Sequence, residues 1–341
     1  MPGPYNFNSQ WKSARNLVLS TNSQLVWNTA LADAALTMRQ RFDGSAVVET
    51  SPTRRSDIDY AGKGTAFATN GQVTSFDTKL SGLKHEASPA SVGWALAFLM
   101  GHETVVGANA PYTHTLTFDE STRTAVPTTV YVEDTEDLHY KCPDMCVNDV
   151  TLTINDIGAI MVESNLIGTG RKINGSMAAI PALAAESYIL GSDAVPTFGP
   201  VGAPAAFTGR LMSATFKFEN QLAVHKAPGG GQYGIFVRKG NPKFSFNATI
   251  AAKDADDVYT LFENDTDSAF AVNANSGAAA QLGISVPHVH LKTTKLGFDG
   301  EMVVWQIEGD ETTCYAVPGA PMTPPISVSV VNGVPAYLVG A

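Results

Sequence analysis

The sequence of 341 residues predicts a mainly β protein in which a plan of strands, one short helix and further strands occurs twice. Most of the chain consists of short runs rich in Val, Ile, Thr and Phe that end at Gly, Asn, Asp or Pro, as strands do. Only two segments have the apolar spacing of a helix, and they lie about half a chain apart. Two similar units at that interval indicate a tandem duplication.

Alternating apolar and polar residues predict the individual strands in both halves. In the first half they are residues 64–80, 113–118, 128–132, 150–154 and 159–164. In the second half they are residues 211–219, 234–237, 243–250, 283–289 and 302–307. Residues 30–41 are ambiguous, because their alanine content favours a helix while their length also suits a strand.

The first predicted helix covers residues 88–100. Ser88 is suited to cap its N-terminus, Pro89 to occupy its first turn and Gly101 to end it. One apolar stripe forms its expected core side: Val92, Leu96 and Leu99.

The second predicted helix covers residues 254–264. Asp254 can cap it, and Asp257 places a negative charge in the first turn, where the helix dipole favours one. Its expected core residues are Val258, Leu261 and Phe262.

These elements divide the chain into three parts. Residues 1–172 form a first domain and residues 207–341 form a second. Residues 173–206 are rich in Ala, Pro and Gly, and we expect them to be a linker or a surface arm.

Charged residues make up only 16% of the chain, against about 25% in ordinary soluble domains. The formal net charge is −10, which excludes a basic nucleic-acid binder, and the apolar content excludes a disordered chain. No apolar run approaches the ~20 residues that would cross a membrane. So few charges suggest that much of the surface packs against other copies of the chain.

The first residues, Met1 to Asn8, have no basic region followed by an apolar one. We therefore expect no signal peptide and folding in the cytoplasm.

No catalytic or metal-binding motif is found, so we expect a non-enzyme without cofactors. The glycine run at residues 229–231 lacks the lysine of a phosphate-binding loop and suits a hairpin tip better. His288 and His290 share one strand face, but no sequence neighbour completes a metal site.

Three cysteines are too few for a disulfide framework. Cys142, Cys146 and Cys314 are either buried thiols or candidates for crosslinks between copies.

The densest acidic cluster lies at residues 133–137. Its carboxylates belong to Glu133, Asp134, Glu136 and Asp137. They could form a solvated loop, an acid–base pair, or the acidic lining of a channel.

An ordered set of segments resembles the tail tube proteins of tailed bacteriophages, most clearly over residues 60–171. The segments are Tyr60 to Phe67, Thr74 to Lys79, Glu86 to Pro89, Gly93 to Phe98, Pro111 to Leu116, Asp149 to Thr153 and Gly168 to Arg171. Residues 211–220 and 241–264 are similar more loosely. The chain is about twice as long as the compact single-domain members of the family.

The resemblance implies two β-sandwich or β-barrel-like units, each with a flanking helix, in rings around a central β-barrel. Stacked rings would form a hollow tube for DNA. Three copies of a two-unit chain, or six copies with one tube unit each, would give six-fold symmetry. Four strands per unit give about 24 strands, and ~4.8 Å spacing with ~40° tilt gives a backbone diameter of ~48 Å. An acidic bore would repel phosphate and let DNA slide.

The resemblance also implies a location in the virion tail, with assembly in the host bacterial cytoplasm. Expected partners are further copies of the chain, a tape-measure protein in the bore, a tail terminator and baseplate or tip proteins, with DNA only in transit and no membrane. Two other functions are considered: a carbohydrate-binding or adhesin β-sandwich, and a β-sandwich hydrolase using Glu133, Asp134 or Glu136. The tryptophans Trp11, Trp27, Trp94 and Trp305 are too scattered to suggest a sugar platform.

Overall fold

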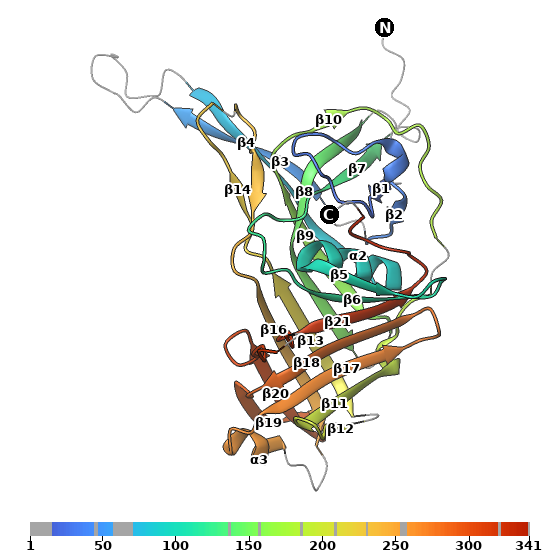
Figure 1. Ribbon diagram of the computed structural model, residues 1–341, viewed down its shortest axis with the longest axis vertical. Helices are drawn as coiled ribbons and strands as arrows, with labels where there is room; N and C mark the ends of the chain where they lie inside the picture. Colours follow the sequence, from blue (N-terminus) through green and yellow to red (C-terminus); the bar gives the residue numbers. More distant parts are fainter. Residues whose placement is uncertain are drawn as a thin grey trace, which may run out of the picture.

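The computed structural model describes residues 16–43, 47–56, 71–135, 138–155, 158–184, 187–207, 210–229, 231–252, 258–319 and 322–339. Two large antiparallel sheets, a small hairpin and two short α-helices make up this part of the chain (Figure 1). The prediction of a mainly β protein is confirmed. Both large sheets are open, and neither closes into a barrel within the described ranges.

The first sheet contains an uninterrupted row of eight strands, which we call the eight-strand row. In spatial order it consists of β3 (Val47–Ser56), β4 (Gly71–Glu86), β9 (Met161–Gly168), β8 (Leu138–Asn155), β13 (Leu211–Glu219), β16 (Lys243–Ala251), β20 (Met302–Asp310) and β19 (Thr293–Asp299). Every neighbouring pair is antiparallel. In the part of the chain that is described, β3 and β19 are the unpaired edges.

β8 is 18 residues long and takes part in two branches of this sheet. From Cys146 onward it pairs with β9, and from Asp149 onward also with β13. Its first part pairs with the second branch. That branch consists of β7 (Thr128–Thr135), β10 (Ile173–Asn174), β1 (Asn16–Leu19) and β2 (Met38–Gln40).

The second sheet has seven strands, and in Figure 1 they run across the eight-strand row. Their order is β12 (Ala205–Ala206), β11 (Ala194–Pro200), β17 (Ser268–Asn275), β18 (Gln281–Val289), β21 (Ser327–Asn332), β6 (Tyr112–Phe118) and β5 (Gly101–Val106). Phe270 of this sheet stacks on two rings of the row, with centroids 4.8 Å from Phe246 and 6.1 Å from Phe216. The two sheets thus form a β-sandwich with a shared aromatic core.

Both sheets combine strands from the two halves of the sequence. β8 pairs with β13, and β21 lies between β6 and β18. Within the eight-strand row, the strand order β3-β4-β9-β8 in the first half matches β13-β16-β20-β19 in the second. The halves therefore have the same strand order but share their sheets and one continuous core.

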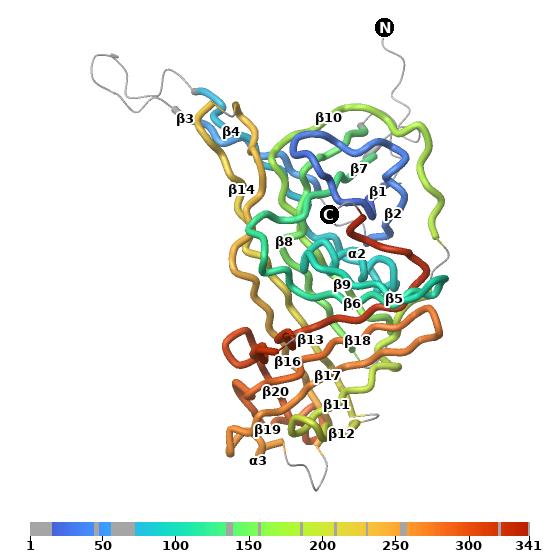
Figure 2. Tube along the Cα trace, viewed as in Figure 1, coloured from blue at the N-terminus to red at the C-terminus, as the bar shows by residue number. Residues whose placement is uncertain are grey.

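Residues 173–206, expected to be a linker or surface arm, contain part of the second sheet. They include β11, β12 and the 3₁₀ turn η2 (Gly191–Asp193). The prolines and glycines of this region argued against a strand and prevented the prediction of β11. Every second residue of β11 is nevertheless buried, namely Ala194, Pro196 and Phe198. The preceding stretch runs along the outside of the molecule from β10 toward β11 (Figure 2).

The helix α2 (Pro89–Met100) begins and ends where its sequence predicts. Ser88 and Ser91 form a reciprocal capping box, and Gly101 ends the helix with φ of +83°. Val92, Leu96 and Leu99 are buried, but so is every other residue of the helix. The expectation of a single apolar stripe is therefore too narrow, because the helix packs against β5, β6, β8 and β21 together.

The second helix, α3 (Val258–Glu263), is shorter than expected in the described residues, because residues 253–257 lie outside them. Val258 is buried, and Leu261 and Phe262 pack partly buried against the core. Residues 30–41 contain both the 3₁₀ turn η1 (Asp33–Ala35) and the strand β2.

A hairpin of β14 (Ala223–His225) and β15 (Phe236–Arg238) accompanies the projecting ends of β3 and β4 (Figures 1 and 2). Tyr233 stacks on Phe76 at 5.6 Å, and Lys226 forms an ion pair with Asp77 at 2.7 Å. These contacts hold the hairpin against the outer part of β4.

The C-terminal segment is anchored beside α2 by buried polar groups. Tyr337 is fully buried, and its hydroxyl donates to the Ala90 carbonyl at 3.0 Å. The backbone N–H groups of Tyr337 and Leu338 donate to the carboxylate of Glu103, which also accepts a 2.7 Å hydrogen bond from His114 Nδ1. Burial raises the pKa of Glu103, but these hydrogen bonds outweigh it and lower that pKa below its ordinary value.

Gly93→Ala tests the packing between α2 and the C-terminal segment. A Cβ at Gly93 would lie 2.4 Å from the Tyr337 hydroxyl oxygen, so the buried ring would have to move. Although alanine favours helix by ~1 kcal/mol, we expect a net loss of about 1–3 kcal/mol in unfolding free energy. Urea unfolding measures it. Gly333→Ala, where the added Cβ contacts nothing, is the control and should be nearly neutral; an equal effect of both variants would contradict this packing.

Glu103→Gln tests the charged anchor through its pH dependence. A carboxyl group with a lowered folded-state pKa stabilises the fold above its unfolded pKa, and this contribution is lost as pH falls through the folded pKa. We expect the variant to lose about 1–3 kcal/mol at pH 7 and to lack part of the acid-side decline. Unfolding curves from pH 7 down to about 3 measure both effects. Glu263→Gln, at an exposed position, is the control. If the stability of wild type and of Glu103→Gln changed with pH in parallel, the charged Glu103 anchor would be excluded.

Candidate functional site

The eight-strand row has one dry face and one wet face, because successive residues of a strand point to opposite sides. Phe216, Phe246 and Ile307, each at most 1% exposed, represent the dry side, which packs against α2 and the second sheet. On the other side, Thr215 and Asn247 are exposed in the middle of their strands. In the described residues, no element covers the middle of this second side. At its Cys146 end, Val237 of β15 packs against it.

We call the uncovered side the polar face. Directly opposite residues of antiparallel neighbours lie on the same side, so the register assigns its members. Its polar members across the central strands are Glu163, Asn165, Asp149, Thr151, Thr153, Asn155, Ser213, Thr215, Lys217, Glu219, Lys243, Ser245, Asn247, Thr249, Gln306, Glu308 and Asp310, and its apolar members include Met161, Ile167, Ala251 and Val304. Toward the two edges they are Glu49, Lys79, Lys84, Glu86, Thr293, Lys295 and Asp299.

Hydroxyl and amide groups predominate among the polar residues of the central strands, charged groups predominate toward the edges, and carboxylates outnumber lysines overall. Many charges are already paired within the chain: Lys217 lies 2.5 Å from Glu219, which raises the lysine pKa. Asp149 accepts a hydrogen bond from Asn165 Nδ2 at 2.6 Å. The face is therefore hydrated and slightly acidic, without a concentrated positive charge across its central strands.

At the β20 end of the polar face, Lys292 links two carboxylates. Its ammonium lies 2.7 Å from Asp310 and 3.8 Å from Glu308. Partial burial raises the pKa of Asp310, but hydrogen bonds from Lys292 and Thr312 outweigh it and lower that pKa. Asp310 consequently stays ionised and fixed in position at neutral pH.

The acidic cluster highlighted by the sequence lies outside the eight-strand row. Glu133 is at the end of β7 and accepts a hydrogen bond from Asn16 Nδ2 at 3.2 Å. Asp134 follows it in β7, whereas Glu136 and Asp137 lie outside the described residues. Whether this hairpin lines a channel stays a prediction. Sequence analysis did not identify the polar-face carboxylates, because they are spread along separate strands such as residues 149–155 and do not cluster in the sequence. The alternation of apolar and polar residues in those strands was the signal that could have identified them.

The three cysteines are buried in the chain and none forms a disulfide. Burial raises the pKa of Cys142 and of Cys314 to about 12, and it also raises that of Cys146. A thiol that stays protonated and inaccessible reacts slowly. These environments favour structural thiols over crosslinks between copies.

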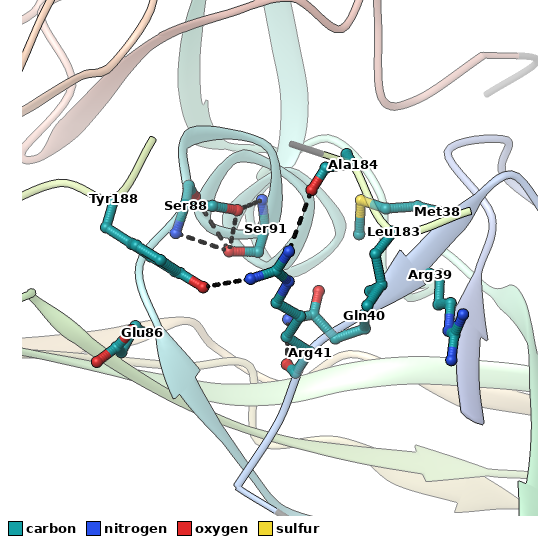
Figure 3. A pocket seen from close by; sticks show the side chains of 10 residues that line it. All are labelled: Met38, Arg39, Gln40, Arg41, Glu86, Ser88, Ser91, Leu183, Ala184 and Tyr188. Carbon is teal, nitrogen blue, oxygen red and sulfur yellow. Dashed lines mark hydrogen bonds between the residues drawn. The ribbon is translucent and has the colours of Figure 1, made fainter. Parts of the chain in front are cut away.

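A cavity at the N-terminus of α2 is lined by side chains that include Arg41, Tyr188 and Ser91 (Figure 3), and it is too small for a ligand. It has a volume of about 30 Å³, which holds one or two water molecules. Arg41 closes one side by donating to the Tyr188 hydroxyl at 2.9 Å, and the capping box already satisfies the helix end.

His288 and His290 each have an aspartate that sequence spacing did not reveal. His288 Nδ1 lies 2.9 Å from Asp267, and His290 Nδ1 lies 3.0 Å from Asp265. The two carboxylates hold the rings in place separately. Across the described ranges, no group of three or more His, Cys, Asp or Glu side chains is arranged to hold a metal ion.

The described tryptophans are packed and do not form a sugar-binding platform. Trp94 is buried, Trp27 packs against Phe236, and Trp305 stacks on Tyr259. Trp11 lies outside the described residues. No helix in the described ranges has the length and apolar character needed to cross a membrane.

Comparison with known proteins gives one match. The profile of a family described as phage tail tube protein matches residues 17–327, which includes both halves of the eight-strand row. No curated protein sequence matches the chain significantly.

The thiol assignment is tested by maleimide labelling of the native protein at neutral pH. We expect Cys142, Cys146 and Cys314 to label at least about a hundredfold more slowly than after unfolding, because each is buried and protonated. Thr215→Cys adds an exposed thiol on the polar face and should label quickly. Rapid labelling of the unmodified protein, or a disulfide-linked dimer on a non-reducing gel, would restore the crosslink interpretation.

Proposed function

The chain belongs to the phage tail tube protein family, and we propose that it assembles into stacked rings whose bore is lined by the polar face. It is thus a structural component of the virion tail. The bore is the conduit for DNA during ejection. The observation that supports this function best is a hydrated sheet face whose middle nothing in the described chain covers, on a row that ends in two unpaired edge strands.

The eight-strand row favours three copies per ring. Three rows of eight strands give 24 strands, and at ~4.8 Å spacing with ~40° tilt the backbone diameter is ~48 Å. Six rows would double this diameter to ~96 Å, far wider than a double helix needs. Three copies of a chain with two four-strand groups would give the bore near six-fold symmetry.

The repeated strand order supports a tandem duplication of the tube unit. The first unit would comprise the β3-β4-β9-β8 group with α2, and the second the β13-β16-β20-β19 group with α3. The domain boundaries at residues 172 and 207 then separate two units that fold against each other, rather than two independent bodies.

The chemistry of the polar face suits passage without adhesion. Its slight acidic excess repels phosphate, its hydroxyl and amide groups keep a layer of water, and its lysines are offset by nearby carboxylates. DNA would be a transient occupant, held at no specific sequence. The bore would also hold a tape-measure protein during assembly, and the tube ends would contact a terminator and the baseplate or tip, in a tail assembled in the host bacterial cytoplasm.

Electron microscopy of purified protein at increasing concentration tests the assembly. We expect stacked rings or tubes of constant width, with a bore of about 30–40 Å once side chains are allowed for. Three-fold symmetry in averaged end views would support three copies. A monodisperse monomer at every concentration would contradict the proposed function.

The orientation of the polar face needs its own measurement. Thr215→Cys protein labelled with a small maleimide–gold particle, mixed as a minor fraction with unlabelled protein, should place gold on the tube axis. Thr115→Cys, exposed on the far side of the second sheet, is the matched control and should place gold outside. Gold from Thr215→Cys on the outer wall would show that the face points away from the bore.

A further inference from the structure

We propose that β19 of one copy pairs antiparallel with β3 of the next, in the register that β8 and β13 use inside the chain. This proposal rests on the proposed ring assembly and adds the residues of its joint. Each of the two unpaired edge strands, β3 and β19, would thus pair with another copy of this chain.

The chain already contains one such joint. In the row, β8 ends the first four-strand group and β13 begins the second, while β19 ends the second group and β3 begins the first. The pairing of β8 with β13 is therefore equivalent to a pairing of β19 with the β3 of another copy. The helices agree with this equivalence, because α2 packs on β8 and α3 packs on β19. With eight alternating strands, β3 and β19 run in opposite directions, so the new pair is antiparallel.

The register follows from aligning the two groups at their closing hairpins. The turn between β8 and β9 contains Gly158, and that between β19 and β20 contains Gly300, both with positive φ. Beyond these turns, Met161 lies opposite Glu86, the last residue of β4, and Val304 lies opposite Ala251, the last residue of β16. The next N–H groups, of Ala87 and Ala252, donate in the same way to the carbonyls of Ile160 and Val303. The pairs Thr153–Met161 and Gly297–Val304 therefore correspond. Counting back along the strands from these pairs, Leu296 takes the place of Leu152, and Lys295 that of Thr151.

The other side of the joint is aligned through the neighbouring strands. With the same hairpin alignment, Leu166 of β9 corresponds to Gly309 of β20. Their partners are Leu80 and Phe246, and the next partners outward are Val48 and Phe216. Val48 therefore takes the place of Phe216, and Glu49 that of Lys217.

Inside the chain, Leu152 lies opposite Phe216, and Thr151 lies opposite Lys217. Between copies, Leu296 therefore lies opposite Val48 of the next copy. Lys295 lies opposite Glu49 of the next copy.

The exposed apolar residues at β19 fit this joint. Leu296 is 57% and Phe298 is 77% exposed, although both are on the dry side of the row. The corresponding residues Leu152 and Ile154 are 0% and 1% exposed, in a strand that pairs with the second group and packs against α2. A second copy at β19 would cover Leu296 and Phe298 in the same way.

The charges also fit. Glu49 and Lys295 are both exposed on the polar face, at opposite edges of the row. The proposed register brings these opposite charges directly across from each other, which is favourable in antiparallel sheets. A shift of two residues keeps the same face but removes this match.

Charge exchange in the full-length protein tests the joint. Glu49→Lys places the new lysine opposite Lys295 of the other copy, as well as opposite Lys79 of its own chain. We expect it to raise the protein concentration needed for tube formation about fivefold at low salt. Combining it with Lys295→Glu restores opposite charges, and tube formation should recover. Both residues are exposed, so circular dichroism of all three proteins should stay the same.

Paired cysteines test the register directly. Directly opposite residues are close enough for a disulfide, so Glu49→Cys with Lys295→Cys should give covalent rings of three chains under oxidation. Ser51→Cys with Lys295→Cys is offset by two residues, about 8 Å, and should not crosslink.

The outcomes separate the two proposals. Tubes that form normally in Glu49→Lys, or that crosslink only with the offset pair, would overturn the register while leaving the tube function intact. Wild-type protein that never forms rings or tubes would overturn the tube function and the joint together.

Discussion

The pairing of β8 with β13 is the interaction on which the rest of the fold depends. It aligns seven residues of each strand, from Asp149 opposite Glu219 to Asn155 opposite Ser213. Because it joins strands from the two halves, it turns two four-strand groups into one row with a continuous wet face and a continuous dry one. Without it, Leu152 and Phe216 would be exposed, and the chain would carry additional open edges.

A sheet with one dry and one wet face constrains the sequence of every strand in it. The dry side carries large apolar residues such as Phe216 and Phe246, which meet Phe270 of the other sheet. The wet side carries threonine, which suits a strand, together with asparagine and paired charges. These polar groups keep the side hydrated without attracting phosphate. One alternating pattern thus stabilises the fold and produces the surface on which the proposed conduit depends.

Local features were predictable from the sequence, whereas features that join distant segments were not. The cap at Ser88, the end at Gly101 and strands such as residues 211–219 follow from neighbouring residues alone. The burial of α2 on all sides depends on packing against four strands, and the pairing of β6 with β21 joins residues more than 200 positions apart. Members of the polar face, such as Thr215, look like ordinary solvent-facing residues until the register places them side by side. The cluster at residues 133–137 attracted attention because its carboxylates are adjacent in sequence, which does not determine where the strands carry them.

The place of β21 sets an order of events during synthesis. It lies between β6 and β18, so the second sheet lacks the strand that joins its two parts until residues 327–332 leave the ribosome. The last strand of the eight-strand row, β20, ends at Asp310, roughly 22 residues earlier, which corresponds to about 1–4 s of translation. During that interval, a nascent chain can complete its joining edges while the sheet that should cover its core is still divided.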